Sequence, residues 1–181
     1  ENIKENISLV RKRIKDKALR VESLSIGTIT NTQIALMYID KVAKEEIVDE
    51  IKRRLNKIKI DGILESGNIE ELIKDDRYSI FPEFLSSEKP DSVAAALLEG
   101  KFAIFTDGTG YVLTAPAMFI EFLQASEDYY HQYMVSSVIR LIRYLALLLT
   151  LFIPAAYVAL VTFHQEMIPA PLLISLAAQR E

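Results

Sequence analysis

The sequence predicts a soluble α/β or α+β domain of two small subdomains, followed by a transmembrane helix and the start of a second membrane segment. Three observations lead to this prediction. Helical and β-rich patterns alternate up to Asp128, most charged residues precede Asp128, and the chain is mainly apolar from Met134 onward. Alternating elements favour a sheet covered by helices, whereas a segregated apolar end favours a lipid bilayer.

The composition excludes several classes of function. The 181 residues include no cysteine, which excludes disulfides, thiol catalysis and thiolate metal sites and is typical of a reducing compartment. A net charge of −4 argues against a nucleic-acid partner, because nucleic acids bind concentrated basic faces. Since the chain stops just after an apolar stretch, we expect it to be a piece of a longer protein.

The first subdomain is expected over residues 1–78. Apolar residues at intervals of three and four from Ile3 to Ala18 predict an amphipathic helix. Its basic face, Arg11–Lys17, is interpreted as a solvated face, with lipid headgroups or nucleic acid as alternatives. The following patterns predict, in order, a strand at Val21–Ile26, a strand at Gln33–Ile39, a helix at Lys44–Lys57 with ion pairs Asp49/Arg53 and Glu50/Arg54, a strand at Lys57–Leu64, and a helix at Asn68–Lys74 capped by Asn68.

The second subdomain is expected over residues 79–128. The Lys89–Ser92 stretch is typical of a helix start, and Gly100 ends the helix that contains Val93–Leu98. The remaining patterns predict strands at Phe102–Thr106 and Tyr111–Thr114, and a helix at Met118–Ala125 after Pro116.

The stretch between these two strands, Asp107-Gly108-Thr109-Gly110, has two interpretations. An acidic residue with two glycines at a strand end can cradle a phosphate in an ATP-using enzyme. A Walker-type loop, however, is closed by a lysine and a Ser/Thr at a helix start, and no such lysine follows. We therefore interpret Asp107, Gly108 and Gly110 as the structural turn of a hairpin, whose glycines supply positive φ.

Residues 144–163 decide the class of protein. This stretch contains about 20 residues without a formal charge, which is the length that a hydrocarbon core of about 30 Å requires. It predicts a transmembrane helix, with a buried helix of a large soluble core as the alternative. Pro154 lies in mid-span and predicts a kink, because it frees a backbone carbonyl.

The flanks of this helix predict its orientation and surroundings. Arg140 and Arg143 precede it, so the positive-inside rule places the N-terminal domain in the cytoplasm. Residues 129–143 are expected to form an interfacial or junction helix, with the tyrosines belonging to the soluble core as the alternative. Residues 167–178 are too few to cross and predict a half-helix or re-entrant segment, or else a helix on the surface. Neither His131 nor the His164/Glu166 pair forms a metal or catalytic constellation, so no catalytic residue, metal or cofactor is expected.

Several segments, in this order, resemble the A subunits of bacterial spore nutrient-germinant receptors, the GerA family. The matching segments are "LVRKRI", "IALMYID", "EIVDEIKRRL", "IKIDGILESGNIEELI", "KPDSVAAALLEGKFAIFTDGT", "EDYY", "IRLIRYLALLLTLFIPAAYVAL" and "FHQEMIPAPLLISLAAQRE". The resemblance covers essentially the whole chain. Family members usually have proline after "DGT", where this chain has Gly110.

The resemblance implies a non-enzymatic, multi-pass protein of the spore inner membrane with a cytoplasmic N-terminal domain. It implies a homo-oligomer, a pentamer, that forms a ligand-gated cation channel triggering germination. The implied partners are a transporter-like B subunit, a lipoprotein C subunit and the bilayer, with no nucleic acid. Residues at the junction, Asp128, Tyr129, Tyr130, Arg140 and Arg143, are then expected to couple the domain to the membrane. The alternatives are a membrane-tethered nucleotide-binding enzyme centred on Asp107, or a non-channel scaffold related to stage V sporulation protein AF.

Overall fold

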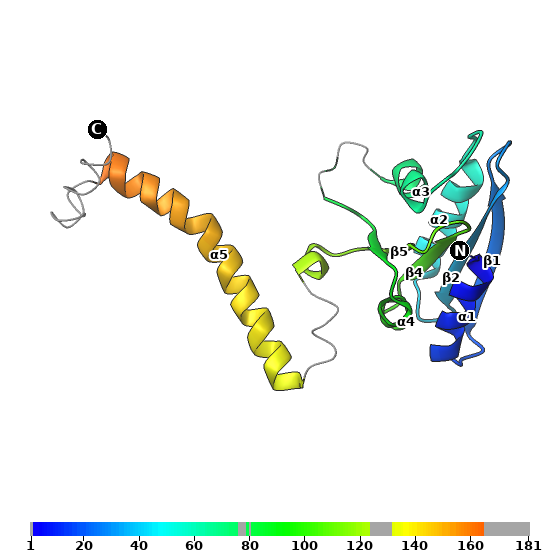
Figure 1. Ribbon diagram of the computed structural model, residues 1–181, viewed down its shortest axis with the longest axis horizontal. Helices are drawn as coiled ribbons and strands as arrows, with labels where there is room; N and C mark the ends of the chain where they lie inside the picture. Colours follow the sequence, from blue (N-terminus) through cyan, green and yellow to red (C-terminus); the bar gives the residue numbers. More distant parts are fainter. Residues whose placement is uncertain (1, 76–78, 80, 124–131, 165–181) are drawn as a thin grey trace. The chain divides into compact units, whose positions relative to one another are not determined.

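The computed structural model describes residues 2–75, 79, 81–123 and 132–164. The chain divides into two units, Glu1–Phe122 and Leu123–Glu181 (Figure 1). The first unit is a folded domain, and the second contains one long helix. The elements, in order, are α1 (Ile3–Arg13), β1 (Leu19–Ile26), β2 (Thr32–Ile39), α2 (Glu45–Lys57), α3 (Ser66–Ile73), β3 (Leu85–Ser87), α4 (Pro90–Leu98), β4 (Phe102–Thr106), β5 (Val112–Ala115), the 3₁₀ helix η1 (Phe119–Leu123) and α5 (Tyr133–Phe163).

The strands of the folded unit form one five-stranded sheet in the order β1-β2-β4-β5-β3. Every neighbouring pair is antiparallel, and the central register places Leu36 of β2 opposite Ile104 of β4. The predicted fold class, a domain of helices and sheet followed by a long apolar helix, is confirmed. Strands from 1–78 and 79–128 lie side by side in this sheet, and the expected subdomain boundary between residues 78 and 79 stays a prediction.

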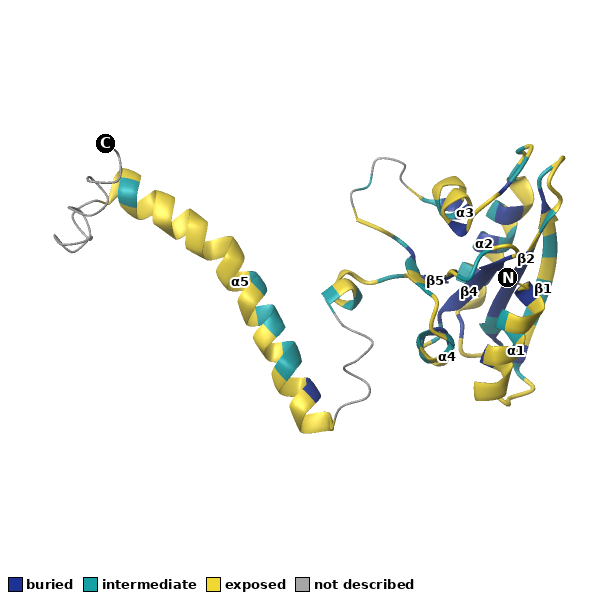
Figure 2. Cartoon of the chain, viewed as in Figure 1, coloured by how far each residue is buried: buried dark blue, intermediate teal, exposed yellow. Residues whose placement is uncertain are grey.

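Helices cover both faces of the sheet and complete two hydrophobic clusters. Ile34 and Leu36 pack with α2 and α3, whereas Ala35 and Met37 point to the opposite face and pack with α1 and α4. Because side chains alternate along a strand, β2 and β4 are buried on both faces, as the dark sheet in Figure 2 shows. Both clusters lie entirely within residues 3–115. The folded unit therefore contains its own complete core.

Several predicted elements are wrong in place or type. No strand forms at Lys57–Leu64; the segment instead braces the β1–β2 turn, where Ile60 and Asp61 carbonyls accept from the N–H groups of Thr28 and Ile29 at 3.0 and 2.8 Å. No strand pairing forms here because Asp61-Gly62 interrupts the segment and its carbonyl groups are already bonded to the β1–β2 turn. Helix α3 begins at Ser66 after the cap residue Glu65, so the expected cap, Asn68, lies inside the helix.

The remaining differences are smaller. Arg53 pairs with Glu50 at 2.5 Å rather than with Asp49, while the Glu50–Arg54 pair forms as predicted at 2.7 Å. The helix expected at Met118–Ala125 is, over its described part, the 3₁₀ helix η1. Strand β3 was not predicted, because its three residues are too few for a strand pattern.

Candidate functional site at the end of the domain and in the apolar helix

The Asp107–Gly110 turn joins β4 to β5 and contacts the start of α1. One carboxylate oxygen of Asp107 accepts the backbone N–H of Ile3 at 3.1 Å, and the Asn6 side chain donates to the carbonyl of Thr109 at 3.5 Å. Gly108 has φ 87°, the left-handed region that favours glycine. Gly110 is not among the positive-φ glycines of the described chain, so only the first of the two expected turn glycines uses this freedom.

This geometry gives Asp107 a structural task. The first N–H groups of a helix lack partners within the helix and carry the positive end of its dipole, so a carboxylate there is stabilising. Asp107 supplies that carboxylate from a residue 104 positions away in the chain. Within the ranges described, no group of three His, Cys, Asp or Glu side chains is arranged to hold a metal ion. The turn accordingly fastens α1 to the sheet.

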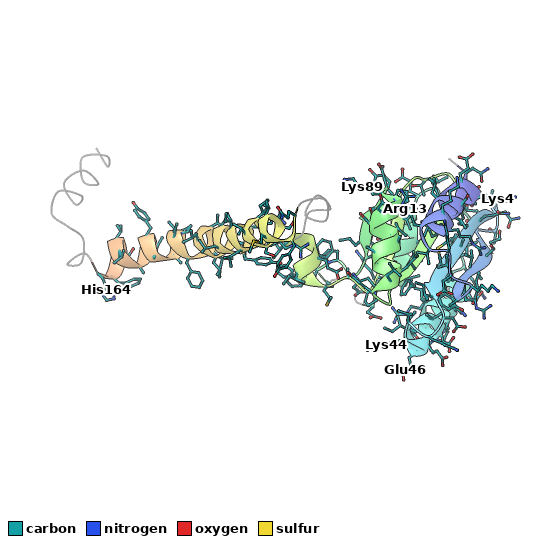
Figure 3. The ribbon with its side chains drawn as sticks, turned by 90° about the horizontal axis from the view of Figure 1, so that it is seen from below. Lys4, Arg13, Lys44, Glu46, Lys89 and His164 are labelled. Atoms are coloured by element: carbon teal, nitrogen blue, oxygen red, sulfur yellow. The ribbon has the colours of Figure 1, made fainter. Side chains whose placement is uncertain are left out.

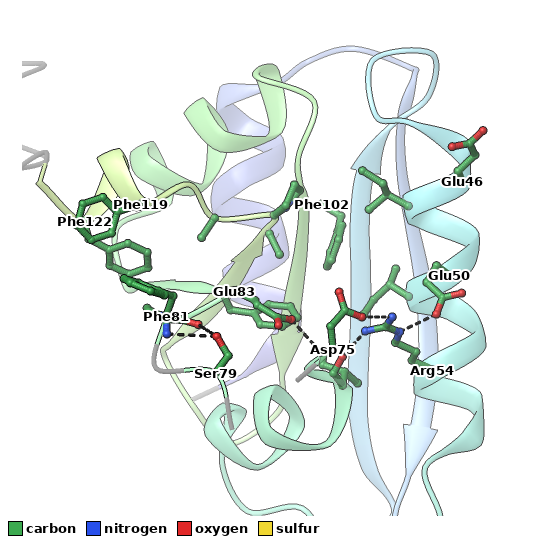
Figure 4. Close-up of a pocket in the computed structure, with 18 residues that line it drawn as sticks. Glu46, Glu50, Arg54, Asp75, Ser79, Phe81, Glu83, Phe102, Phe119 and Phe122 are labelled. Atoms are coloured by element: carbon green, nitrogen blue, oxygen red, sulfur yellow. Dashed lines mark hydrogen bonds and ion pairs between the residues drawn. The ribbon is translucent and has the colours of Figure 1, made fainter. Parts of the chain in front are cut away.

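A pocket of about 560 Å³ lies between α2 and η1 (Figure 4). Its walls are mainly apolar and come from α2, the end of α3, the 79–84 segment, β4, β5 and the Pro116–Phe122 segment. Phe119 and Phe122 of η1 form one side, and Phe81 meets Phe119 edge to face with ring centroids 5.7 Å apart. The pocket therefore offers apolar contact area to whatever enters it.

Arg54 joins two of the carboxylates at this pocket. Arg54 bridges Glu50, at 2.7 Å, and Asp75, and also donates to the carbonyl of Ile73 at 2.8 Å. Hydrogen bonds from Arg53 and Arg54 lower the pKa of Glu50 from its ordinary 4.5 to about 2. The backbone N–H of Asp75 donates to Glu83 at 3.0 Å. No histidine, lysine or cysteine is among the described lining residues.

A second polar cluster ties α2 to the sheet. The Tyr38 hydroxyl donates to Glu22 at 2.6 Å, and the Lys52 ammonium lies 2.7 Å from the same carboxylate and 5.0 Å from the centre of the Tyr38 ring. The hydrogen bond to Glu22 raises the pKa of Tyr38. Burial opposes ionisation of Glu22, but hydrogen bonds from Lys52 and Tyr38 outweigh it and lower the pKa of that carboxyl. The cluster holds Lys52 charged and braces α2.

Sequence reasoning missed the ion pair between Lys101 and Glu121. The Lys101 ammonium lies 2.5 Å from Glu121, and the two side chains are only 10% and 12% exposed. Glu121 also accepts the backbone N–H of Met118 at 3.3 Å. Gly100, with φ 90°, turns the chain from α4 into β4 and so orients Lys101 toward η1. No sequence signal marks such a pair, because its two members are 20 residues apart and belong to no periodic pattern.

Helix α5 has 31 residues and a mean hydropathy of 2.3 over its most apolar window, and none of that window is buried. At 1.5 Å per residue it is about 46 Å long, enough to cross a hydrocarbon core of about 30 Å. Figure 3 shows its side chains projecting along its length, with His164 at the far end. Helix α5 contributes no residue to either hydrophobic cluster of the folded unit.

Two hydroxyl groups within α5 find partners in the helix itself. The Thr150 hydroxyl donates to the carbonyl of Leu147 at 2.8 Å, and Ser137 donates to the carbonyl of Tyr133 at 2.9 Å. The helix continues through Pro154, which has no N–H for the Thr150 carbonyl. The kink at Pro154 stays a prediction. The expected boundary at residue 144 is not a break, because one helix covers both the junction segment from Tyr133 and the span.

The expected junction residues are only partly within the described chain. Arg140 and Arg143 lie in the N-terminal part of α5, and Arg143 donates to the carbonyl of Leu123 at 2.8 Å. Asp128, Tyr129 and Tyr130 lie outside the described residues, as do His131, Glu166 and the expected half-helix at 167–178. The coupling role of all five junction residues stays a prediction.

Comparison with known proteins gives consistent matches over the whole chain. The model of the family described as Bacillus/Clostridium GerA spore germination protein matches residues 1–181. Spore germination protein KA of Bacillus subtilis is 51% identical over 181 residues, which is 100% of this chain and 33% of that protein. The B. subtilis protein named "Uncharacterized membrane protein YfkQ" is also 51% identical over 181 residues, 100% of this chain and 35% of that protein. The chain thus spans about a third of the length of these relatives.

A solved structure matches the folded unit. The crystal structure of the N-terminal domain of the A subunit of the Bacillus megaterium spore germinant receptor GerK3 is 48% identical, with a TM-score of 0.53. The match covers 65% of this chain and 94% of that one.

Proposed function

The chain belongs to the Bacillus/Clostridium GerA spore germination protein family, and from this we propose that it is part of the A subunit of a nutrient germinant receptor. In this proposal the folded unit is cytoplasmic and α5 is the first span of a multi-pass protein of the spore inner membrane. The observation that carries the proposal is a long helix whose most apolar window is not buried, which follows a folded domain in a family of germination proteins.

We further propose that the subunit works without enzymatic chemistry, as part of an oligomeric channel with B and C subunits. The role of Asp107 supports the absence of phosphate chemistry at the turn, because its carboxylate is engaged by the start of α1. ATP binding and hydrolysis by the folded unit test the enzyme alternative; saturable turnover lost in Asp107→Ala would overturn the proposal. Ion flux through the full-length protein in liposomes separates a channel from a scaffold related to stage V sporulation protein AF.

The junction arginines give the most direct test of topology and coupling. Arg140→Glu combined with Arg143→Glu is expected to lower the amount of assembled receptor in the spore inner membrane, because it removes the positive flank that keeps the N-terminal side in the cytoplasm. Arg140→Lys with Arg143→Lys keeps the charge and should assemble. The matched control is Lys15→Glu with Lys17→Glu, the same change of charge at exposed positions of the folded unit. Unchanged assembly of the Arg140/Arg143 charge-reversal variant would refute the proposal.

A further inference from the structure

An apolar patch lies at the end of the folded unit, made of Phe81, Met118, Phe119, Ile120 and Phe122. These side chains are 65%, 58%, 60%, 47% and 41% exposed. Isolated exposed apolar residues are common on soluble proteins, but a contiguous group that includes three aromatic rings marks an interaction surface.

The charged residue of η1 is mostly buried and its apolar residues are exposed, which is the reverse of a helix that faces water. Its charged residue, Glu121, is turned inward and is paired with Lys101, whereas its apolar neighbours Phe119, Ile120 and Phe122 face outward. A short helix on a soluble protein normally buries its apolar side and exposes its charges. Here the outward face is built for apolar surroundings.

The patch is also held in place by specific contacts. The backbone N–H of Ala117 donates to the carbonyl of Glu83 at 2.9 Å, Glu121 accepts from Met118, and Phe81 packs on the edge of Phe119. The ion pair between Lys101 and Glu121 fastens the same segment to the start of β4. The exposure of the apolar side chains therefore belongs to an ordered segment of the folded unit.

We propose that this patch lies in the headgroup region of a lipid bilayer, an inference that rests on the proposed membrane location of α5. The chain gives the reason for choosing lipid as the occupant. Only residues 124–132 separate Leu123 from the first residue of α5, and nine residues extend to at most about 30 Å. Apolar and aromatic side chains on an ordered segment insert readily at the boundary of headgroups and acyl chains.

The charges beside the patch define which lipids it contacts. The nearby pocket carries four carboxylates, those of Glu46, Glu50, Asp75 and Glu83, against the single guanidinium of Arg54. This excess of negative charge gives no attraction to anionic headgroups. Apolar insertion drives the contact, so zwitterionic vesicles should support it at least as well as anionic ones.

The absence of tryptophan from the chain allows single-tryptophan reporters. The 181-residue chain is reconstituted as Phe119→Trp in phosphatidylcholine vesicles that carry a spin label on the headgroup, and emission is compared with unlabelled vesicles. Circular dichroism confirms that the variant folds. We expect a blue-shifted emission that the headgroup label quenches. Ile29→Trp, at a side chain 80% exposed in the β1–β2 turn, is the matched control and should be quenched less.

A third reporter separates this inference from the proposed span. Leu149→Trp, in the middle of α5, should be quenched by labels deep in the acyl chains and not by headgroup labels. If Leu149→Trp is quenched and Phe119→Trp is no more quenched than Ile29→Trp, the patch does not contact lipid and the inference is overturned. A blue-shifted Phe119→Trp without quenching also overturns it, because a protein surface then covers the patch. Leu149→Trp without deep quenching would instead overturn the proposed span.

Discussion

The ion pair between Lys101 and Glu121 should dominate the attachment of η1 to the domain. Lys101→Met removes the charged group but keeps a side chain of similar length. The Glu121 carboxylate, whose side chain is 12% exposed, is then left with the Met118 N–H as its remaining described partner. Removing one partner of a buried pair costs roughly 3–5 kcal/mol, because an uncompensated charge stays buried. The small remaining exposure favours the lower end, about 3 kcal/mol.

Replacing both residues should lower the free energy of unfolding far less. Lys101→Met with Glu121→Met removes both charges from their mostly buried site, and such exchanges are often neutral or stabilising. Because Glu121→Met alone should also destabilise, the double-mutant cycle should give a coupling energy of at least about 3 kcal/mol. For a domain of roughly this size, 3 kcal/mol corresponds to a fall in Tm of about 12 °C.

Urea and thermal unfolding of the isolated domain, followed by circular dichroism, measure these values. The isolated domain is suitable because both hydrophobic clusters lie within residues 3–115. Glu121→Gln gives an independent single variant and should also destabilise, since Lys101 then loses its closest carboxylate. Two single variants that unfold within about 1 kcal/mol of the wild type would refute the reasoning.

Three further predictions concern the same domain. Asp107→Ala should destabilise it by about 1 kcal/mol in urea, because the Ile3 N–H at the start of α1 loses its acceptor although Asn2 still caps the helix, while Asp107→Asn should keep most of the stability; equal values for the two would exclude this role. Gly100→Ala should lower the Tm more than Gly108→Ala. Both glycines have positive φ, but a Cβ at residue 100 would lie 2.9 Å from the carbonyl oxygen of Val42, whereas one at residue 108 meets nothing within 4 Å. Similar losses of Tm would show that only the positive φ matters. Neighbouring arginines hold the pKa of Glu50 at about 2 against its ordinary 4.5, so its ionised form stabilises the domain above pH 4.5 and this contribution is lost as the pH falls toward 2. Glu50→Gln should therefore flatten the dependence of the free energy of unfolding on pH across that interval. An unchanged slope would contradict this role of Glu50.

Local patterns were enough to predict most of the sheet and the apolar helix. Strand β4 has the predicted bounds, Phe102–Thr106, because a fully apolar run between turn residues has few other solutions. Helix α2 could be predicted because its apolar stripe repeats over three turns, and it begins only one residue later than expected. The apolar length of α5 is a property of composition and needs no tertiary information.

The errors arise where contacts between residues far apart in the sequence determine the local structure. The segment after α2 has the composition of a strand, but its hydrogen-bond partners are the β1–β2 turn, which no local pattern can reveal. The pairing of β2 with β4 is equally hidden from local patterns, because it joins Leu36 to Ile104 across 68 positions. Asp107 is the informative case at the candidate site: its residue type suggested phosphate or turn, and only the fold brings the start of α1 within 3.1 Å of it.

Three charged groups that contact distant segments share one physical role. Asp107 binds the start of α1, Arg54 joins α2 to the end of α3, and Lys101 joins β4 to η1; each connects segments that the hydrophobic clusters alone would leave loose. Such pairs add little net stability over apolar replacements, but they permit one arrangement of the connected segments. At η1 this arrangement turns the carboxylate of Glu121 inward and the apolar side chains outward, which water would not favour. The folded unit therefore ends in an ordered segment whose apolar side chains are exposed, and this is the surface from which we infer contact with lipid.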